Sequence, residues 1–127
     1  MPDQLNSMGV PEIGIRQAQL LLEASTATFV DVRDPNSFSA GHVPGATHLD
    51  DSNVQQFVAS ANKQATVVVY CYHGNSSLGA TAFFQDQGFT AVSSLSGGFA
   101  AWQEAGGASE RGTSDLLSPP DGSVAPP

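Results

Sequence analysis

The run Thr-Val-Val-Val-Tyr at residues 66–70 is the feature that most limits how this chain can fold. It is apolar on both faces of an extended strand, so both faces must be buried, as they are in parallel sheets. A similar β-branched and aromatic run occupies residues 28–32, and residues 90–94 form a third candidate strand. The sequence therefore predicts a sheet built around residues 66–70.

Segments with helical spacing of apolar residues separate these strands. Residues 15–22 and 52–59 repeat apolar side chains at i, i+3 and i+4, and an Asp-Ser pair is the expected N-cap of the second segment. Residues 77–87 form a third helix that ends before Gly88, a left-handed C-cap, and Gly98 opens a last helix in which Trp102 fills core. Alternating strands and helices predict an α/β fold, a parallel sheet flanked by helices on both faces.

The chain has 127 residues, which fits one domain. More than half of residues 106–127 are Gly, Ser or Pro, a composition typical of disorder. We therefore expect a flexible N-terminus at 1–7, a folded domain at 8–105 and a disordered acidic tail at 106–127.

Charge and cysteine content exclude several functions. The formal net charge of −8 argues against nucleic acid or anionic membrane as partners, because both require clustered Lys and Arg. One cysteine excludes an internal disulfide and a CxxC pair, and because the three histidines are scattered we expect no metal site and no cofactor. The chain shows no membrane-spanning run and no secretory signal, so we expect a cytoplasmic protein.

The segment Cys-Tyr-His-Gly-Asn-Ser-Ser at residues 71–77, the cysteine loop, connects the central strand to a helix. In parallel sheets, ligands bind beyond the carboxyl ends of the strands, which is where Cys71 lies. Gly74 permits a sharp turn, and the following helix N-terminus directs amides and its positive dipole end toward the thiol. Such an anion nest favours the thiolate and lowers a cysteine pKa from about 8.5 into the range ~3.5–7.5. We predict Cys71 as the nucleophile and, as binding residues, Tyr72, His73, Gly74, Asn75, Ser76 and Ser77.

The side chains next to the thiol have two interpretations each. His73 could pair with Cys71 as a base, but residues two apart in a tight loop point in different directions, so we expect an imidazole in solvent. Tyr72 could form a wall of the pocket or pack under the loop.

The cysteine loop resembles the active-site loop of single-domain rhodaneses. Residues 31–34 with Phe38 and 41–46, and residues 95–102, resemble the two flanking signatures of that family, so the resemblance covers residues 8–105 in order. It implies a five-stranded parallel sheet and a sulfurtransferase that uses a persulfide. By that mechanism the Cys71 thiolate takes the outer sulfur of thiosulfate, a small-molecule donor, and passes it to cyanide or a thiol, with the loop amides holding the persulfide.

The flanking motifs are interpreted as scaffold. We expect Asp31 and Arg33 to pair with each other, and residues 42–45 to form a rigid turn in which His42 has no catalytic role. Gly97 and Gly98 allow a close backbone approach to the cysteine loop.

Three alternative functions would use a related fold or the same loop. Phosphatases of related fold place arginine six positions after the cysteine, but here position 77 is serine and no Arg lies between 34 and 110. A protein-binding module would not need Cys71. A persulfide carrier that delivers sulfur to a protein such as thioredoxin needs the same loop, so the sequence leaves this function open.

Leu78 stands where the resemblance leads us to expect a basic residue, so we predict weak binding of thiosulfate.

Overall fold

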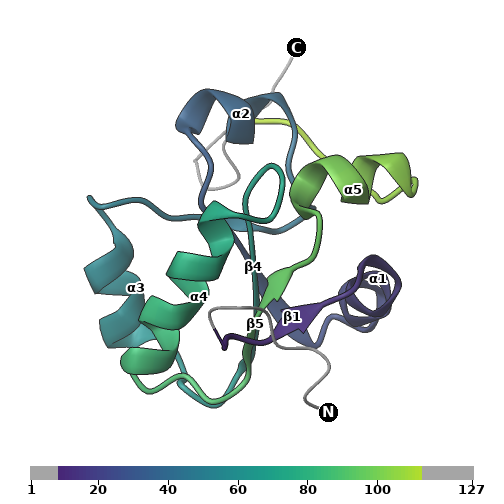
Figure 1. The fold of residues 1–127 in the computed structure, drawn as a ribbon. Helices are drawn as coiled ribbons and strands as arrows, with labels where there is room; N and C mark the ends of the chain where they lie inside the picture. Colours follow the sequence, from purple (N-terminus) through teal and green to yellow (C-terminus); the bar gives the residue numbers. More distant parts are fainter. Residues whose placement is uncertain (1–8, 113–127) are drawn as a thin grey trace.

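Residues 9–112, which the computed structural model describes, form a five-stranded sheet with helices on both faces (Figure 1). The elements are β1 (Glu12–Ile13), α1 (Ile15–Ala24), β2 (Ala27–Asp31), α2 (Pro35–Ala40), β3 (Thr47–His48), α3 (Val54–Ser60), β4 (Thr66–Tyr70), α4 (Ser76–Asp86), β5 (Val92–Leu95) and α5 (Gly98–Glu104). Every strand pair is parallel. The predicted α/β fold with a parallel sheet is confirmed.

The strand predicted to be buried on both faces is the centre of the sheet. The strand order is β1-β5-β4-β2-β3, so β4 has a hydrogen-bonded neighbour on each side. Its residues Val67 to Tyr70 are all at most 2% exposed. Because all five strands run in the same direction, their carboxyl ends meet at one edge, and the loops after β2 and β4 lie side by side there.

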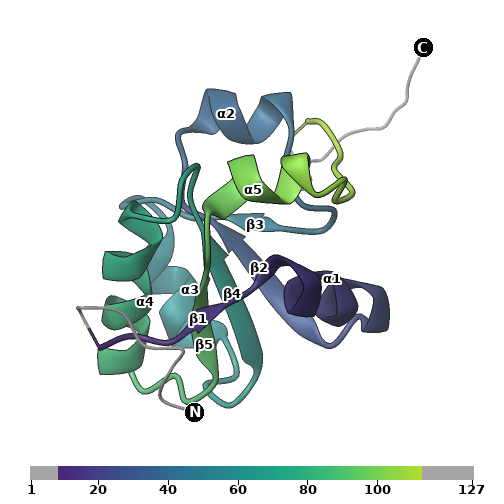
Figure 2. The same cartoon turned by 45° about the vertical axis from the view of Figure 1, so that its right-hand side comes forward.

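Side chains of β4 alternate between two apolar cores. Val68 and Tyr70 belong to the core that contains Ala18 of α1 and Trp102 of α5. On the opposite face, Val67 and Val69 pack with side chains of α3 and α4, among them Val58 and Phe84. Figure 2 shows α1 and α5 on one side of the sheet and α3 and α4 on the other.

Three short elements were not predicted, namely β1, α2 and β3. The two strands have two residues each, too few for an alternating pattern to be detected. Helix α2 has six residues and is fixed by its start, where the carboxylate of Asp34 accepts a hydrogen bond from the amide of Ser37 and Pro35 is the first helical residue. Helix α3 begins at Val54, two residues later than predicted, because Asp50 accepts bonds from the amide and hydroxyl of Ser52 in a preceding turn.

The first part of the expected tail is bound to the body. Trp102 donates its indole N–H to the carbonyl of Ala108 (2.7 Å), and Glu110 forms an antiparallel bridge with His42. The amide of Gly112 donates to the carbonyl of Ser39 (2.8 Å). Among the described residues, the folded body therefore includes residues 106–112 as well, because backbone pairing compensates for the poor apolar content of this segment. Expectations for residues 1–8 and 113–127 lie outside the described residues.

Within residues 9–112, no helix is both long and apolar enough to cross a membrane.

Candidate active site

Cys71 lies directly after β4, at the edge where the carboxyl ends of the strands meet. Its side chain is 6% exposed, and it is a free thiol. The buried strand fixes its Cα, while the next residues turn back to begin α4 at Ser76. The thiol is thus held at the base of a short loop rather than on a mobile surface segment.

The cysteine loop wraps its backbone around the sulfur. The amide of Gly74 lies 3.1 Å from Sγ of Cys71, and the amide of Ser77 lies 3.3 Å from it. Gly74 has φ +95°, a conformation that turns its N–H inward and that other residues rarely adopt. The hydroxyl of Ser77 completes the group at 3.4 Å.

These hydrogen bonds favour the charged form of the thiol. Burial alone would raise the pKa of Cys71, but the hydroxyl and amide of Ser77 and the amides of Gly74 and Ser76 outweigh burial and lower it below its ordinary value. The sequence predicted a lowered pKa for Cys71, which is the direction found here. Among residues 9–112, the groups that stabilise the thiolate are therefore neutral dipoles of the cysteine loop.

Helix α5 supports the loop from the other side. The amide of Phe99 donates to the carbonyl of Cys71 (2.8 Å), and the amide of Ala100 donates to the carbonyl of Tyr72 (2.9 Å). Gly98 makes this approach possible, since a Cβ at this position would lie 2.5 Å from the carbonyl oxygen of Tyr72. The close contact expected at Gly97 and Gly98 is therefore with the cysteine loop.

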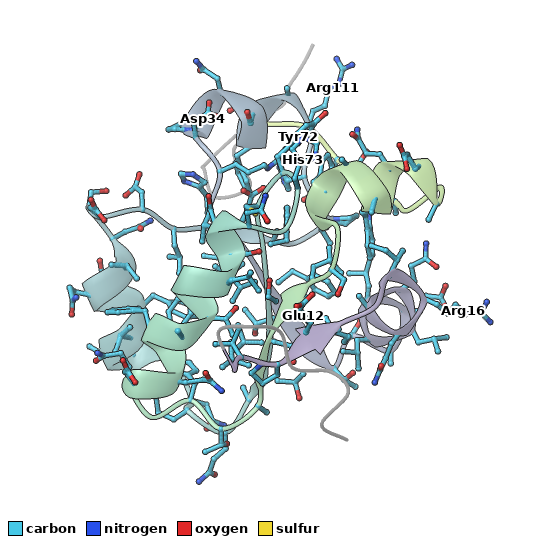
Figure 3. All side chains as sticks on the ribbon, viewed as in Figure 1. Glu12, Arg16, Asp34, Tyr72, His73 and Arg111 are labelled. Atoms are coloured by element: carbon cyan, nitrogen blue, oxygen red, sulfur yellow. The ribbon has the colours of Figure 1, made fainter. Side chains whose placement is uncertain are left out.

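The rings of Tyr72 and His73 point outward. Tyr72 is 49% exposed, and the two ring centroids lie 4.5 Å apart in an edge-on arrangement. Figure 3 labels both residues near α5. Tyr72 also lines a cavity of about 320 Å³ with Arg33 and Phe99, so its ring forms a wall of a surface cavity instead of packing under the loop.

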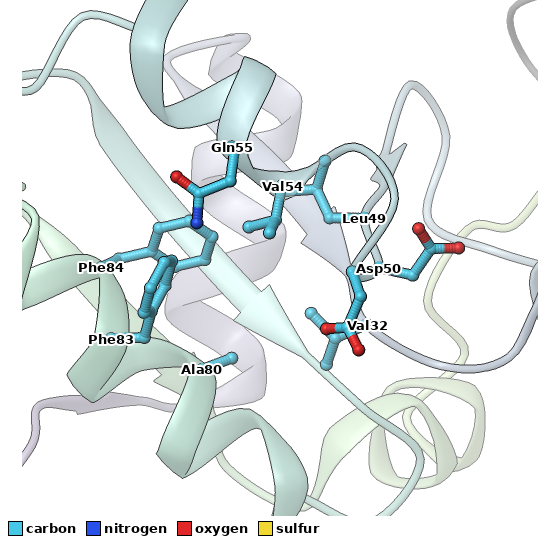
Figure 4. Close-up of a pocket in the computed structure, with 9 residues that line it drawn as sticks. Val32, Leu49, Asp50, Val54, Gln55, Ala80, Phe83 and Phe84 are labelled. Carbon is cyan, nitrogen blue, oxygen red and sulfur yellow. The ribbon is translucent and has the colours of Figure 1, made fainter.

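A larger cavity of about 480 Å³ lies between α3 and α4 (Figure 4). Its walls include Val54, Ala80 and Phe83, and its rim carries the carboxylates of Asp50 and Asp51. No residue of the cysteine loop lines it, so we do not assign the chemistry to this cavity.

The flanking residues Asp31, Arg33 and His42 make their contacts within the scaffold. Asp31 is fully buried and forms a salt bridge of 2.6 Å with Arg33, whose guanidinium also donates to the carbonyl of Gly41. His42 is fully buried, stacks on Phe38 with centroids 3.8 Å apart, and contacts the carbonyl of Phe38 through Nδ1 (2.7 Å). Neither Arg33 nor His42 makes a hydrogen bond to the sulfur among the contacts described for residues 9–112.

One polar residue near the thiol was missed by the sequence analysis. Ser94 of β5 is 1% exposed, and its hydroxyl lies 2.8 Å from that of Ser77. The sequence contains a weak signal for it, because Ser94 shares a strand face with buried Val92. A serine at such a position requires a buried hydrogen-bond partner.

Comparison with known proteins agrees with this geometry. The family model described as the rhodanese-like domain matches residues 15–105. Thiosulfate sulfurtransferase GlpE of Pseudomonas aeruginosa (strain LESB58) is 50% identical over 91 residues, which cover 72% of this chain and 82% of the relative. Thiosulfate sulfurtransferase GlpE of Pseudomonas entomophila (strain L48) is 49% identical over 84 residues, covering 66% and 77%. A crystal structure of the Alr3790 protein from Anabaena sp. superposes with a TM-score of 0.72 at 29% identity, covering 78% of this chain and 81% of that one.

Proposed function

The chain belongs to the rhodanese-like domain family, and on that premise we propose that it is a thiosulfate sulfurtransferase in which Cys71 carries the transferred sulfur. The observation that carries this proposal is the set of polar groups around one buried thiol: the amides of Gly74 and Ser77, which donate to the sulfur, and the hydroxyl of Ser77, which accepts from the thiol and can donate to the thiolate. They lower the pKa of Cys71 and so supply a nucleophile without a separate base.

The proposed reaction has two displacements. The Cys71 thiolate attacks the outer sulfur of thiosulfate, and the S–S bond of the donor breaks with its electron pair leaving on sulfite. Cys71 then bears a persulfide whose outer sulfur is anionic. In the second step cyanide or a thiolate attacks that outer sulfur, thiocyanate or a hydropersulfide leaves, and the Cys71 thiolate is restored.

The remaining amides of the cysteine loop are assigned to the outer sulfur. Those of Gly74 and Ser77 already contact Sγ. The binding role that we predicted for Tyr72, His73, Asn75 and Ser76 is therefore a backbone role, with their N–H groups forming the wall of the nest around the added atom. A loop with serine at position 77 and no arginine clamp suits one sulfur atom better than a phosphoester dianion.

The acceptor is proposed to be a thiol that reaches Cys71 beside the exposed ring of Tyr72. A protein dithiol such as thioredoxin is a candidate, because a half-exposed aromatic ring next to a reactive group offers contact area to a protein surface. Comparing kcat/KM for reduced thioredoxin with that for dithiothreitol tests this; equal values would leave the small thiol as the acceptor. A reduced lone thiol also keeps the cytosol as the proposed location.

Intact mass spectrometry tests the covalent step. Treatment with thiosulfate should add the mass of one sulfur atom, and cyanide or dithiothreitol should remove it. The Cys71→Ser variant is the control and should gain no mass. A native protein that gains no sulfur while its thiol still reacts with iodoacetamide would contradict the proposed function.

A further inference from the structure

Two buried hydroxyls form a chain that begins at the sulfur of Cys71. Oγ of Ser77 lies 3.4 Å from Sγ, and Oγ of Ser94 lies 2.8 Å from Oγ of Ser77. Ser77 is 0% exposed and Ser94 is 1% exposed, so water does not replace either partner readily. We propose that Ser94 is a positioning residue that stabilises the Cys71 thiolate through Ser77.

The protons of the two hydroxyls can be arranged to suit either charge state of Cys71. Each hydroxyl has one proton to donate and can also accept. While Cys71 is a thiol, its S–H donates to Ser77, whose hydroxyl donates to Ser94. When Cys71 loses its proton, Ser77 must donate to the sulfur, and its oxygen then needs a donor, which Ser94 supplies. Both charge states are therefore satisfied by rotating hydroxyl protons, with no movement of heavy atoms.

Removing Ser94 affects the two charge states unequally. In the thiolate state the oxygen of Ser77 would be buried without the donor from Ser94, and its O–H would be a weaker donor to sulfur. In the thiol state the oxygen of Ser77 still accepts the S–H of Cys71, and the O–H of Ser77 loses only a hydrogen bond between neutral groups, which is roughly half as strong as one in a chain that ends on a charge. The loss therefore falls mainly on the thiolate, and the pKa of Cys71 should rise.

Ser94 is well placed for this role because its strand is held on both sides. Its Cα pairs with Val69 of β4 and Glu12 of β1, and its amide donates to the carbonyl of Pro11 (2.9 Å). The partner is fixed as well, since the carbonyl of Ser77 accepts the hydroxyl of Thr81 (2.7 Å). A hydroxyl on a rigid strand can hold a loop side chain in one rotamer.

The neighbouring residue provides a matched control. Ser93 is on the same strand but, by strand alternation, faces the opposite side of the sheet from Ser94 and the cysteine loop. It is half-buried, so Ser93→Ala removes the same hydroxyl from β5 without touching the chain of hydrogen bonds.

The experiment is a double-mutant cycle in which the pKa of Cys71 is measured from the pH dependence of its alkylation by iodoacetamide. This inference rests on the proposed function, but iodoacetamide reacts with the thiolate of the single cysteine whether or not sulfur is transferred. A failed sulfur-loading test with an intact cycle would therefore contradict the enzyme and not the hydroxyl chain. Native protein, Ser77→Ala, Ser94→Ala, the double variant and Ser93→Ala are compared, with circular dichroism to verify folding.

The net free energy of a single hydrogen bond sets the size of the expected shifts in the pKa of Cys71. Ser77→Ala should raise the pKa of Cys71 by about one unit and Ser94→Ala by roughly half a unit. In the Ser77→Ala background, Ser94→Ala should add no further shift, and Ser93→Ala should match the native protein. Equal shifts from Ser94→Ala in both backgrounds, or none in either, would overturn the proposal.

A second pair keeps the test decisive if Ser94→Ala does not fold. Ser94→Thr and Ser94→Val have nearly the same shape and differ in the hydroxyl. Ser94→Thr should have the lower thiol pKa of the two, and identical profiles for the pair would likewise overturn the proposal.

Discussion

Gly98 offers a direct test of how helix α5 holds the cysteine loop. In Gly98→Ala the added Cβ would lie 2.5 Å from the carbonyl oxygen of Tyr72 and 2.6 Å from that of Cys71. Both contacts are with backbone, so the helix and the loop must separate. Gly98 also has φ +66°, a conformation in which an alanine is strained.

The expected cost has two parts. The left-handed backbone costs an alanine about 1–2 kcal/mol. Separation weakens two hydrogen bonds, from Phe99 to Cys71 and from Ala100 to Tyr72, each worth about 1 kcal/mol. We therefore expect Gly98→Ala to lower the free energy of unfolding by about 3–4 kcal/mol, a large fraction of the ~5–15 kcal/mol typical of a domain.

Gly106→Ala is the matched control. Gly106 has φ +79°, but a Cβ there would meet nothing within 4 Å, so only the backbone strain remains. Urea unfolding should show Gly98→Ala to be less stable than Gly106→Ala by about 2 kcal/mol, the value of the two hydrogen bonds. Alkylation should also show a raised pKa of Cys71 in Gly98→Ala alone. Equal stabilities, or an unchanged thiol pKa, would refute the role assigned to α5.

Four further changes test the site and its surroundings. Cys71→Ser should abolish sulfur transfer, measured as thiocyanate formation, while circular dichroism stays native; turnover in this variant would contradict the nucleophile assignment. Folding lowers the pKa of Cys71, so this group stabilises the protein fully above its pKa in the unfolded state, and this stabilisation is lost as the pH falls through its pKa in the folded state. The urea midpoints of the native protein and of Cys71→Ser should therefore converge toward low pH. Leu78→Lys should lower KM for thiosulfate, and modest salt should raise kcat/KM of the native protein by screening its net charge of −8; unchanged values would show that the site senses only its own amides. Glu110→Ala removes the side-chain contacts to the amide of Gly45 and to His42 but keeps the backbone bridge, so thermal unfolding should show a loss of about 1 kcal/mol, and no loss would mean that the carboxylate of Glu110 does not stabilise the body.

The long elements could be predicted because each repeats its pattern several times. Residues 66–70 are β4 with the predicted bounds, and the strand predicted at 28–32 is β2, shifted by one residue. Gly88 has φ +100° and follows α4 as the C-cap pattern predicts. Strands β1 and β3 could not be found, since their two residues pair only because neighbouring strands are already in place.

The residues of the site also divide into local ones, which the sequence reveals, and distant ones, which it does not. The thiol, the turn at Gly74 and the helix start are consecutive in the chain, so their meeting is a local property that the sequence reveals. Ser94 and Glu110 reach their partners across 17 and 68 residues, and such contacts depend on the assembled sheet. Residues 106–112 were assigned to the tail because their composition is poor in apolar groups, yet a backbone bridge and the indole N–H of Trp102 hold them.

The sulfur of Cys71 is stabilised by amide and hydroxyl dipoles, and this affects how readily an anionic leaving group can depart from the site. The guanidinium of Arg33, which lines a cavity together with Tyr72 of the loop, is paired with Asp31 and lies over the ring of Phe99, 4.3 Å from its centroid. A cation at the thiol would attract any anion and would partly neutralise the thiolate that it stabilises. Amides and hydroxyls instead stabilise charge only within hydrogen-bond reach, so some amides of the loop serve Sγ and others would serve the second sulfur of the proposed persulfide, one bond further out. On the proposed mechanism the loop would therefore lower the pKa of Cys71 and still release sulfite, because its dipoles would hold the sulfur that stays without binding the charge that leaves.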